Sequence, residues 1–175
     1  MKNYKYIFLS SIIIFMLTVV VHFAYDLFKF NVMAVFFPTN ESIFQHMKMI
    51  YTSFIIFYLG LNIIKRRYGY NNILLTSLIS VSSTIIFFLV IYLPVRFRFG
   101  EVMIFTFILL FISIMIGQII SYSFLEKENY KGLNIISLII MIMFYIIFAY
   151  LTFNPIHNDI FWDPEHETYQ RVIKN

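Results

Sequence analysis

Residues 73–95 read ILLTSLISVSSTIIFFLVIYLPV. The stretch contains no charged side chain, and a helix needs about 20 mostly apolar residues to cross the hydrocarbon core of a bilayer. We therefore predict a transmembrane helix here. Further runs of the same kind lie on both sides of it, so the pattern of this one stretch indicates the fold class of the whole chain.

The composition is that of a membrane protein. Of the 175 residues, 61% are hydrophobic and 13% are charged, and the mean hydropathy is +0.81. A soluble domain carries about 25% charged residues. The net charge of +4 is typical of basic loops beside anionic lipid, so we expect membrane lipid as a partner and not nucleic acid. The absence of cysteine excludes disulfides, a thiol nucleophile and a Cys-ligated zinc site.

Five uncharged or weakly charged runs can span a membrane. We predict an all-α, integral membrane bundle that forms a single domain over residues 1–175, with a short folded C-terminal tail at residues 157–175. The first run has no small-x-small cleavage site after it, so we read it as an uncleaved helix. The predicted spans cover approximately residues 6–25, 43–64, 73–95, 102–125 and 132–156.

An odd number of spans places the loop after span one, the loop after span three and the tail on one face of the membrane. All four histidines of the chain fall on that face. The KRR run at residues 65–67 lies on the other face and favours a cytoplasmic N-terminus by the positive-inside rule. We therefore expect a multi-pass protein of the cell membrane with its polar site and C-terminus outside.

His22 and Asp26 lie near the end of span one. Their spacing of four puts them on one face of a helix. The carboxylate can orient the imidazole, or both side chains can bind one metal ion. The alternative is a pair of polar residues that reach the interface at a helix end.

Residues 36–48, FFPTNESIFQHMK, gather polar side chains after the first span. We expect Thr39 or Asn40 to cap the next helix, with Glu41 at the positive end of its dipole. Capping does not explain His46 and Lys48, which lie later, so an interface anchor and a functional site both stay open. If the helix already includes Glu41, this residue lies on one stripe with Gln45 and Lys48, and Glu41 and Lys48 can pair through Gln45.

Arg96 and Arg98 alternate with aromatic residues between spans three and four. This pattern is typical of side chains that reach to the lipid headgroups. The same pair can hold a lipid phosphate by charge-assisted hydrogen bonds.

The tail begins where Asn154 and Pro155 end the last span, because the residue before a proline is disfavoured in a helix. The hydrophobic triplet of residues 160–162, IFW, predicts that the tail folds back on the membrane face, with Trp162 at the headgroup level. If it docks there, three of its polar residues come near His22 and His46, namely His157, Asp159 and Asp163.

Span four carries small residues at a spacing of four, Ser113, Gly117 and Ser121, which permits close helix packing. Ser80 and Thr84 on span three can do the same. We expect Gln118 to donate a hydrogen bond between helices.

Three motifs together resemble a family of small multi-pass prokaryotic membrane proteins classed as a domain of unknown function. They are HFxY after the first span, NESxxxHxK, and TFxPxH followed by FxDP and a tyrosine. The chain departs from the family pattern at two places. It has Gln45 where the family has Glu. At residues 167–170 the family has Gly-Thr-Tyr-Gly, and because this chain lacks those glycines, we expect a tight turn there less than in the family. The resemblance implies no activity. The matching residues are His22, Asn40, Glu41, Ser42, His46, Lys48, Pro155, His157, Asp163, Pro164 and Tyr169.

The leading hypothesis is a metal-assisted hydrolase that acts on a lipid or another membrane-embedded substrate. Zinc, manganese or iron suits a site of His and carboxylate side chains, although no motif such as HExxH is present. Glu41 is the candidate general base, and Arg96 or Arg98 the headgroup ligand. The candidate metal ligands are His22, His46 and His157, with Asp26 or Asp163.

Two other classes stay open. A non-catalytic scaffold, partner subunit or immunity-type protein would use the same polar residues to cap helices and fix the tail. A small-solute transporter would normally need ionisable residues near mid-bilayer. Spans three to five have none, which disfavours a transporter.

Overall fold

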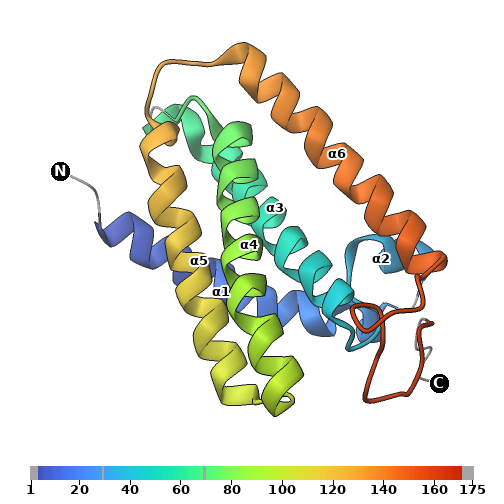
Figure 1. The fold of residues 1–175 in the computed structure, drawn as a ribbon. Coiled ribbons are helices and arrows are strands. Elements are labelled where there is room, and N and C mark those ends of the chain that lie inside the picture. Colours follow the sequence, from blue (N-terminus) through green and yellow to red (C-terminus); the bar gives the residue numbers. More distant parts are fainter. Residues whose placement is uncertain (1–3, 29, 69, 171–175) are drawn as a thin grey trace.

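The computed structural model describes residues 4–28, 30–68 and 70–170, with the side chains of residues 65–68, and so of the KRR run, outside the described part. Within these ranges the protein is all-helical, and five helices are long and apolar enough to cross a membrane. This confirms the predicted fold class. Figure 1 shows the helices, which are α1 (Tyr4–Leu27), α2 (Asn31–Phe36), α3 (Ile43–Tyr68), α4 (Ile73–Phe99), α5 (Met103–Leu125) and α6 (Lys131–Phe153).

The helices differ from the predicted spans at several ends, and one short helix was not predicted. Helices α1 and α3 are longer than predicted, α1 by two residues at each end and α3 by four residues at its C-terminal end. Helix α4 continues past Pro94 to Phe99, so Arg96 and Arg98 lie in its last turn and not in a loop. Basic side chains there complement the negative end of the helix dipole. Helix α6 ends at Phe153, before Pro155, three residues earlier than predicted. Helix α2 has only six residues, too few for a periodic hydrophobic pattern to indicate it.

Helices α4 and α5 run side by side (Figure 1) and pack closely at Gly117. A Cβ atom at Gly117 would lie 2.6 Å from the carbonyl oxygen of Ser80 and would also meet Thr84. Ser113 and Ser121, one turn away on either side, are fully buried. The small residues therefore have the packing role that the sequence predicts.

Gln118 links four helices inside the bundle. Its amide nitrogen donates to Tyr58 Oη of α3 at 3.2 Å and to Ser80 Oγ of α4 at 2.8 Å, and its amide oxygen accepts from Ser10 Oγ of α1 at 2.9 Å. The predicted interhelical donor is thus confirmed. A polar side chain inside a membrane bundle requires such partners because lipid tails supply none.

Helix α3 holds the end of α2. The fully buried Lys48 ammonium donates to Ala34 O at 2.7 Å and to Thr152 Oγ1 of α6 at 3.0 Å. One turn further along α3, Thr52 Oγ1 donates to Phe36 O at 2.6 Å. The last four carbonyls of a helix have no intrahelical partner. Lys48 and Thr52 therefore donate the hydrogen bonds that the backbone of α2 cannot provide.

The C-terminal tail folds back on the start of α3, as the sequence predicts (Figure 1). The carbonyl of Ile160 accepts the backbone N–H of Phe44 at 3.0 Å, and the ring of Phe161 stacks on that of Phe44 with centroids 4.5 Å apart. Further along, Gln170 O accepts from Asn40 Nδ2 at 3.0 Å. The tail is thereby attached to residues on both sides of Glu41.

Within the tail, a tight turn forms around the buried Asp163. Its carboxylate accepts the backbone N–H of Glu165 at 2.9 Å and the ring Nδ1–H of His166 at 2.9 Å. An isolated antiparallel bridge joins Asp163 to Thr168. Glu167 has a φ of 48°, a left-handed conformation that glycine adopts more easily. The turn is therefore present although this chain lacks the glycine that the resembled family has here.

We expect Gly117→Ala to destabilise the bundle, because the added methyl group collides with backbone of α4. Overpacking of this kind costs about 1–3 kcal/mol. The matched control is Gly60→Ala on α3, where a Cβ meets nothing within 4 Å. The measurement is the temperature at which the detergent-purified protein loses its monodisperse size-exclusion peak. Equal midpoints for the two variants would contradict the close α4–α5 contact.

We expect Phe161→Ala to release the tail while the spans stay folded. Burial of a Phe side chain contributes about 1.5–3 kcal/mol, so cleavage in the tail by a Glu-specific protease should accelerate about tenfold or more. Ile156→Ala is the control, since that side chain is 52% exposed. Cleavage of both variants at the wild-type rate would show that the Phe44–Phe161 contact does not hold the tail.

Candidate functional site

The loop between α2 and α3 presents Glu41. Asn40 Oδ1 accepts the backbone N–H of Ser42 at 3.1 Å, and Ser42 Oγ accepts the N–H of Gln45 at 3.3 Å. The capping residue of α3 is therefore Ser42, and the prediction of Thr39 or Asn40 was wrong. The reason is that the Asn40 side chain stabilises a turn ahead of the helix, so the helical conformation begins at Ile43.

This late start also changes the partners of Glu41. Because Glu41 precedes the helix, it does not lie on one stripe with Gln45 and Lys48. The Gln45 side chain instead accepts from Thr39 N at 3.4 Å and donates to Thr152 Oγ1 at 3.4 Å. The expected pairing of Glu41 and Lys48 through Gln45 was wrong.

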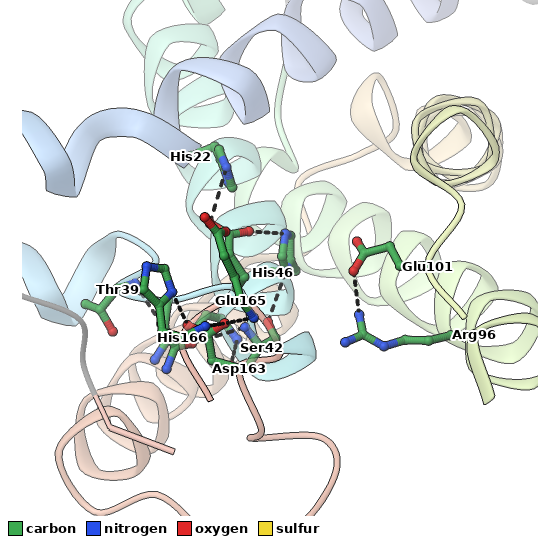
Figure 2. A network of polar contacts seen from close by, with 12 residues as sticks. His22, Thr39, Ser42, His46, Arg96, Glu101, Asp163, Glu165 and His166 are labelled. Carbon is green, nitrogen blue, oxygen red and sulfur yellow. Dashed lines mark hydrogen bonds and ion pairs between the residues drawn. The ribbon is translucent and has the colours of Figure 1, made fainter. Parts of the chain in front are cut away.

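Glu41 lies between two histidines from different helices. Its Oε1 is 3.6 Å from His22 Nε2 on α1, and its Oε2 is 3.4 Å from His46 Nε2 on α3. Figure 2 labels His22 and His46 and marks both of these contacts with dashed lines. One ligand atom from each residue lies within 4.8 Å of the others, and all three residues are partly buried. We call these three residues the His–Glu cluster.

Hydrogen bonding fixes the tautomer of His46. Its Nδ1 lies 2.9 Å from the carbonyl oxygen of Ser42. A carbonyl oxygen only accepts, so Nδ1 carries the proton. In the neutral ring the Nε2 lone pair then faces the Glu41 carboxylate. The lone pairs of Nε2 and of the carboxylate oxygen repel each other at this distance, and a metal ion bound between them would remove that repulsion.

The spacing of the cluster permits a shared metal ion. The two His–Glu separations of 3.6 and 3.4 Å run to different oxygens of the carboxylate. One ligand atom of each residue lies within 4.8 Å of the others, whereas neighbouring ligand atoms of a tetrahedral zinc site lie roughly 3.3 Å apart. The three side chains would therefore have to draw together to hold a divalent ion.

The other predicted ligands lie elsewhere. Asp26 is exposed near the end of α1, and Asp163 is buried against His166. His157 is exposed and stacks on Tyr169 with ring centroids 4.6 Å apart. In the described part of the chain, the His–Glu cluster is the one group of three such side chains close enough to share an ion. The docked tail, with its exposed Asp159, does not add a member to it.

Arg96 and Arg98 differ in their surroundings. Arg96 donates to Tyr92 Oη at 2.6 Å and to Glu101 Oε2 at 3.4 Å (Figure 2), with 13% of its side chain exposed. Arg98 is exposed at the end of α4. Of the two candidate headgroup ligands, Arg96 is therefore the one that is partly buried and held by two hydrogen bonds. Its partner Glu101 lies between α4 and α5.

A cavity of about 300 Å³ adjoins the His–Glu cluster. It is lined by α1, α3, α4 and α5, and His22, Glu41, His46 and Glu101 all contribute to its wall. Glu101 is a residue of the site that the sequence analysis did not single out. Its place between spans three and four, on the same membrane face as the four histidines, is the sequence signal that could have indicated it.

The cavity combines ionisable and apolar groups. Two imidazoles and one carboxylate could hold a metal ion together, and three such ligands would leave a position for a further ligand. The second carboxylate, Glu101, lies on the same cavity and is paired with the Arg96 guanidinium. The rest of the cavity wall is mostly apolar.

Comparisons with known proteins identify a family but no activity. No curated protein and no solved structure matches the chain. A family model covers residues 1–170, which is nearly the whole chain. The protein therefore belongs to a family of unknown function, DUF6512.

Proposed function

We propose that the protein is a metal-dependent membrane hydrolase that cleaves an ester bond of a membrane lipid. One observation carries the proposal: His46, with its proton held at Nδ1 by Ser42, directs Nε2 at the same carboxylate that faces His22. A cation between these groups removes the repulsion of their lone pairs. A hydrogen bond from the distal ring nitrogen to a carbonyl is also the usual way in which a metal-binding histidine is oriented.

The proposed metal is a single zinc, manganese or iron ion on His22, Glu41 and His46. When bound, it would polarise a water molecule or a substrate carbonyl. A glutamate that ligates through one oxygen keeps the other available to accept a proton from water, so Glu41 can combine both roles. Glu101 is the second carboxylate on the cavity, and Arg96 beside it can stabilise an anionic headgroup.

Metal content tests the proposal directly. We expect detergent-purified wild-type protein to contain near-stoichiometric zinc, manganese or iron by elemental mass spectrometry, and His22→Ala and His46→Ala to lose it. His157→Ala is the control variant, because His157 stacks on Tyr169 outside the cluster. Wild type and control should hydrolyse ester lipids and lose this activity when a chelator removes the metal.

Two results would overturn this reading. A well-folded wild type without metal, even after metal is supplied, would favour a non-catalytic scaffold in which the cluster only fixes the loop after α2. Loss of metal in His157→Ala with retention in His22→Ala would move the site to the tail.

We further propose that the N-terminus is cytoplasmic and that the His–Glu cluster faces outward in the cell membrane. Because the chain has no cysteine, single cysteines can report its topology. We expect a membrane-impermeant maleimide to label Asp159→Cys, in the tail, on intact cells. Glu128→Cys, in the α5–α6 loop, should react only after the cells are broken. Both native side chains are exposed, and the opposite labelling pattern would invert the orientation.

A further inference from the structure

The cavity beside the His–Glu cluster has a polar end and an apolar interior. Its ionisable residues are the cluster and Glu101, whereas the remaining wall is made of apolar side chains and two threonines. Both threonine hydroxyls bond within their own helices, Thr18 to Ile14 O at 2.8 Å and Thr106 to Val102 O at 3.1 Å. Beyond the polar end, the wall therefore suits a hydrocarbon ligand.

The cavity extends along two helices into the membrane. On α1 its lining runs from His22 back to Phe15, and on α5 it runs from Met103 to Leu110. Seven residues of α-helix correspond to about 10 Å. Helix α1 ends and helix α5 begins on the same membrane face. The polar end of the cavity therefore lies at the membrane surface, and its apolar end points towards the bilayer centre.

The seam between α1 and α5 opens to lipid. On this side the lining residues Phe23 and Phe107 are 55% and 48% exposed. The apolar lining residues from α3 and α4 are buried, with Ile50 at 1% and Phe88 at 4% exposure. Exposed surface on a membrane-spanning helix faces lipid tails, so a chain can reach the cavity sideways from the bilayer.

We propose that this cavity binds one acyl chain of a glycerophospholipid and places the carboxylic ester of that chain at the His–Glu cluster. A volume of about 300 Å³ lies at the lower end of the range of ligand pockets, roughly 300–1,000 Å³. The cavity also follows α1 and α5 for about 10 Å, and a narrow, elongated apolar space of this kind suits one hydrocarbon chain. The apolar wall begins directly beside the cluster, so the group that reaches the cluster is the one attached to the chain.

The inference rests on the proposed hydrolase and defines its substrate class. Water adds to the ester carbonyl carbon, and the bond from that carbon to the glycerol oxygen breaks. One proton of the water passes to the glycerol oxygen. The products are a fatty acid and a lysophospholipid, and no oxidant or other co-reactant is needed.

Photolabelling tests chain binding independently of hydrolysis. The probe is a phosphatidylcholine with a diazirine at the tenth carbon of one chain, in vesicles that contain the full-length protein. We expect mass spectrometry to locate the label on the floor of the cavity, at the buried Phe88 and Leu110 and at the partly buried Phe15.

Two variants and a control sharpen the test. Leu110→Trp removes about two methylene groups of space, and each buried methylene contributes roughly a fourfold factor in affinity, so floor labelling should fall about tenfold. Val19→Trp narrows the lipid-facing rim, where the native side chain is 36% exposed, and should lower labelling without change to the core. Ile112→Trp, on α5 but outside the cavity lining, should label as wild type does.

The outcomes separate the two proposals. Label spread evenly over lipid-facing residues such as Ile104 and Ile139, with none on the cavity floor, would overturn the chain site even if metal is present. Floor labelling in a well-folded wild type that binds no metal, even after metal is supplied, would support the chain site and count against the hydrolase. Equal labelling of all three tryptophan variants would overturn the proposed route and depth.

Discussion

The contact between the Lys48 ammonium and the carbonyl of Ala34 decides where the site lies. Inside a membrane bundle each polar group must find its partner within the protein, and the last carbonyls of α2 are such groups. Lys48 and Thr52 meet them from α3, at 2.7 and 2.6 Å. Helix α2 is thereby fixed against α3, and the loop of residues 37–42 connects its end to Ile43. Glu41 lies on that path, between His22 and His46.

The protein contains two polar centres that differ in kind. Around Gln118, three neighbouring helices supply hydrogen-bond partners to both ends of the amide, which makes the centre a structural one. Around Glu41, the carboxylate oxygens lie 3.6 and 3.4 Å from two ring nitrogens, and the cluster lies on the wall of a cavity. A fully satisfied polar network makes a fold rigid and specific, whereas convergent polar groups on an apolar cavity make a candidate binding site.

Hydropathy was sufficient for the membrane spans and insufficient for the cluster. The spans follow from long uncharged runs because lipid imposes one solution, the helix, on each of them. The start of α3 depended on the Asn40 turn, a local hydrogen bond that competes with helix formation. The approach of His22 to Glu41 depended on how α1 packs against α3, and helix spacing along the chain does not encode that. His157 and Asp163 shared the right membrane face, but the tail gave them the partners Tyr169 and His166.

The left-handed conformation of Glu167 sets a lower limit on how firmly the tail is bound. A residue with a Cβ atom in this conformation loses roughly 1–2 kcal/mol relative to the right-handed one, a cost that a glycine largely avoids. The tail nevertheless closes its turn and spans the loop on both sides of Glu41. Its docking contacts must therefore release more free energy than the turn consumes. The tail therefore holds the loop that carries Glu41 in place through contacts that outweigh the backbone strain at Glu167.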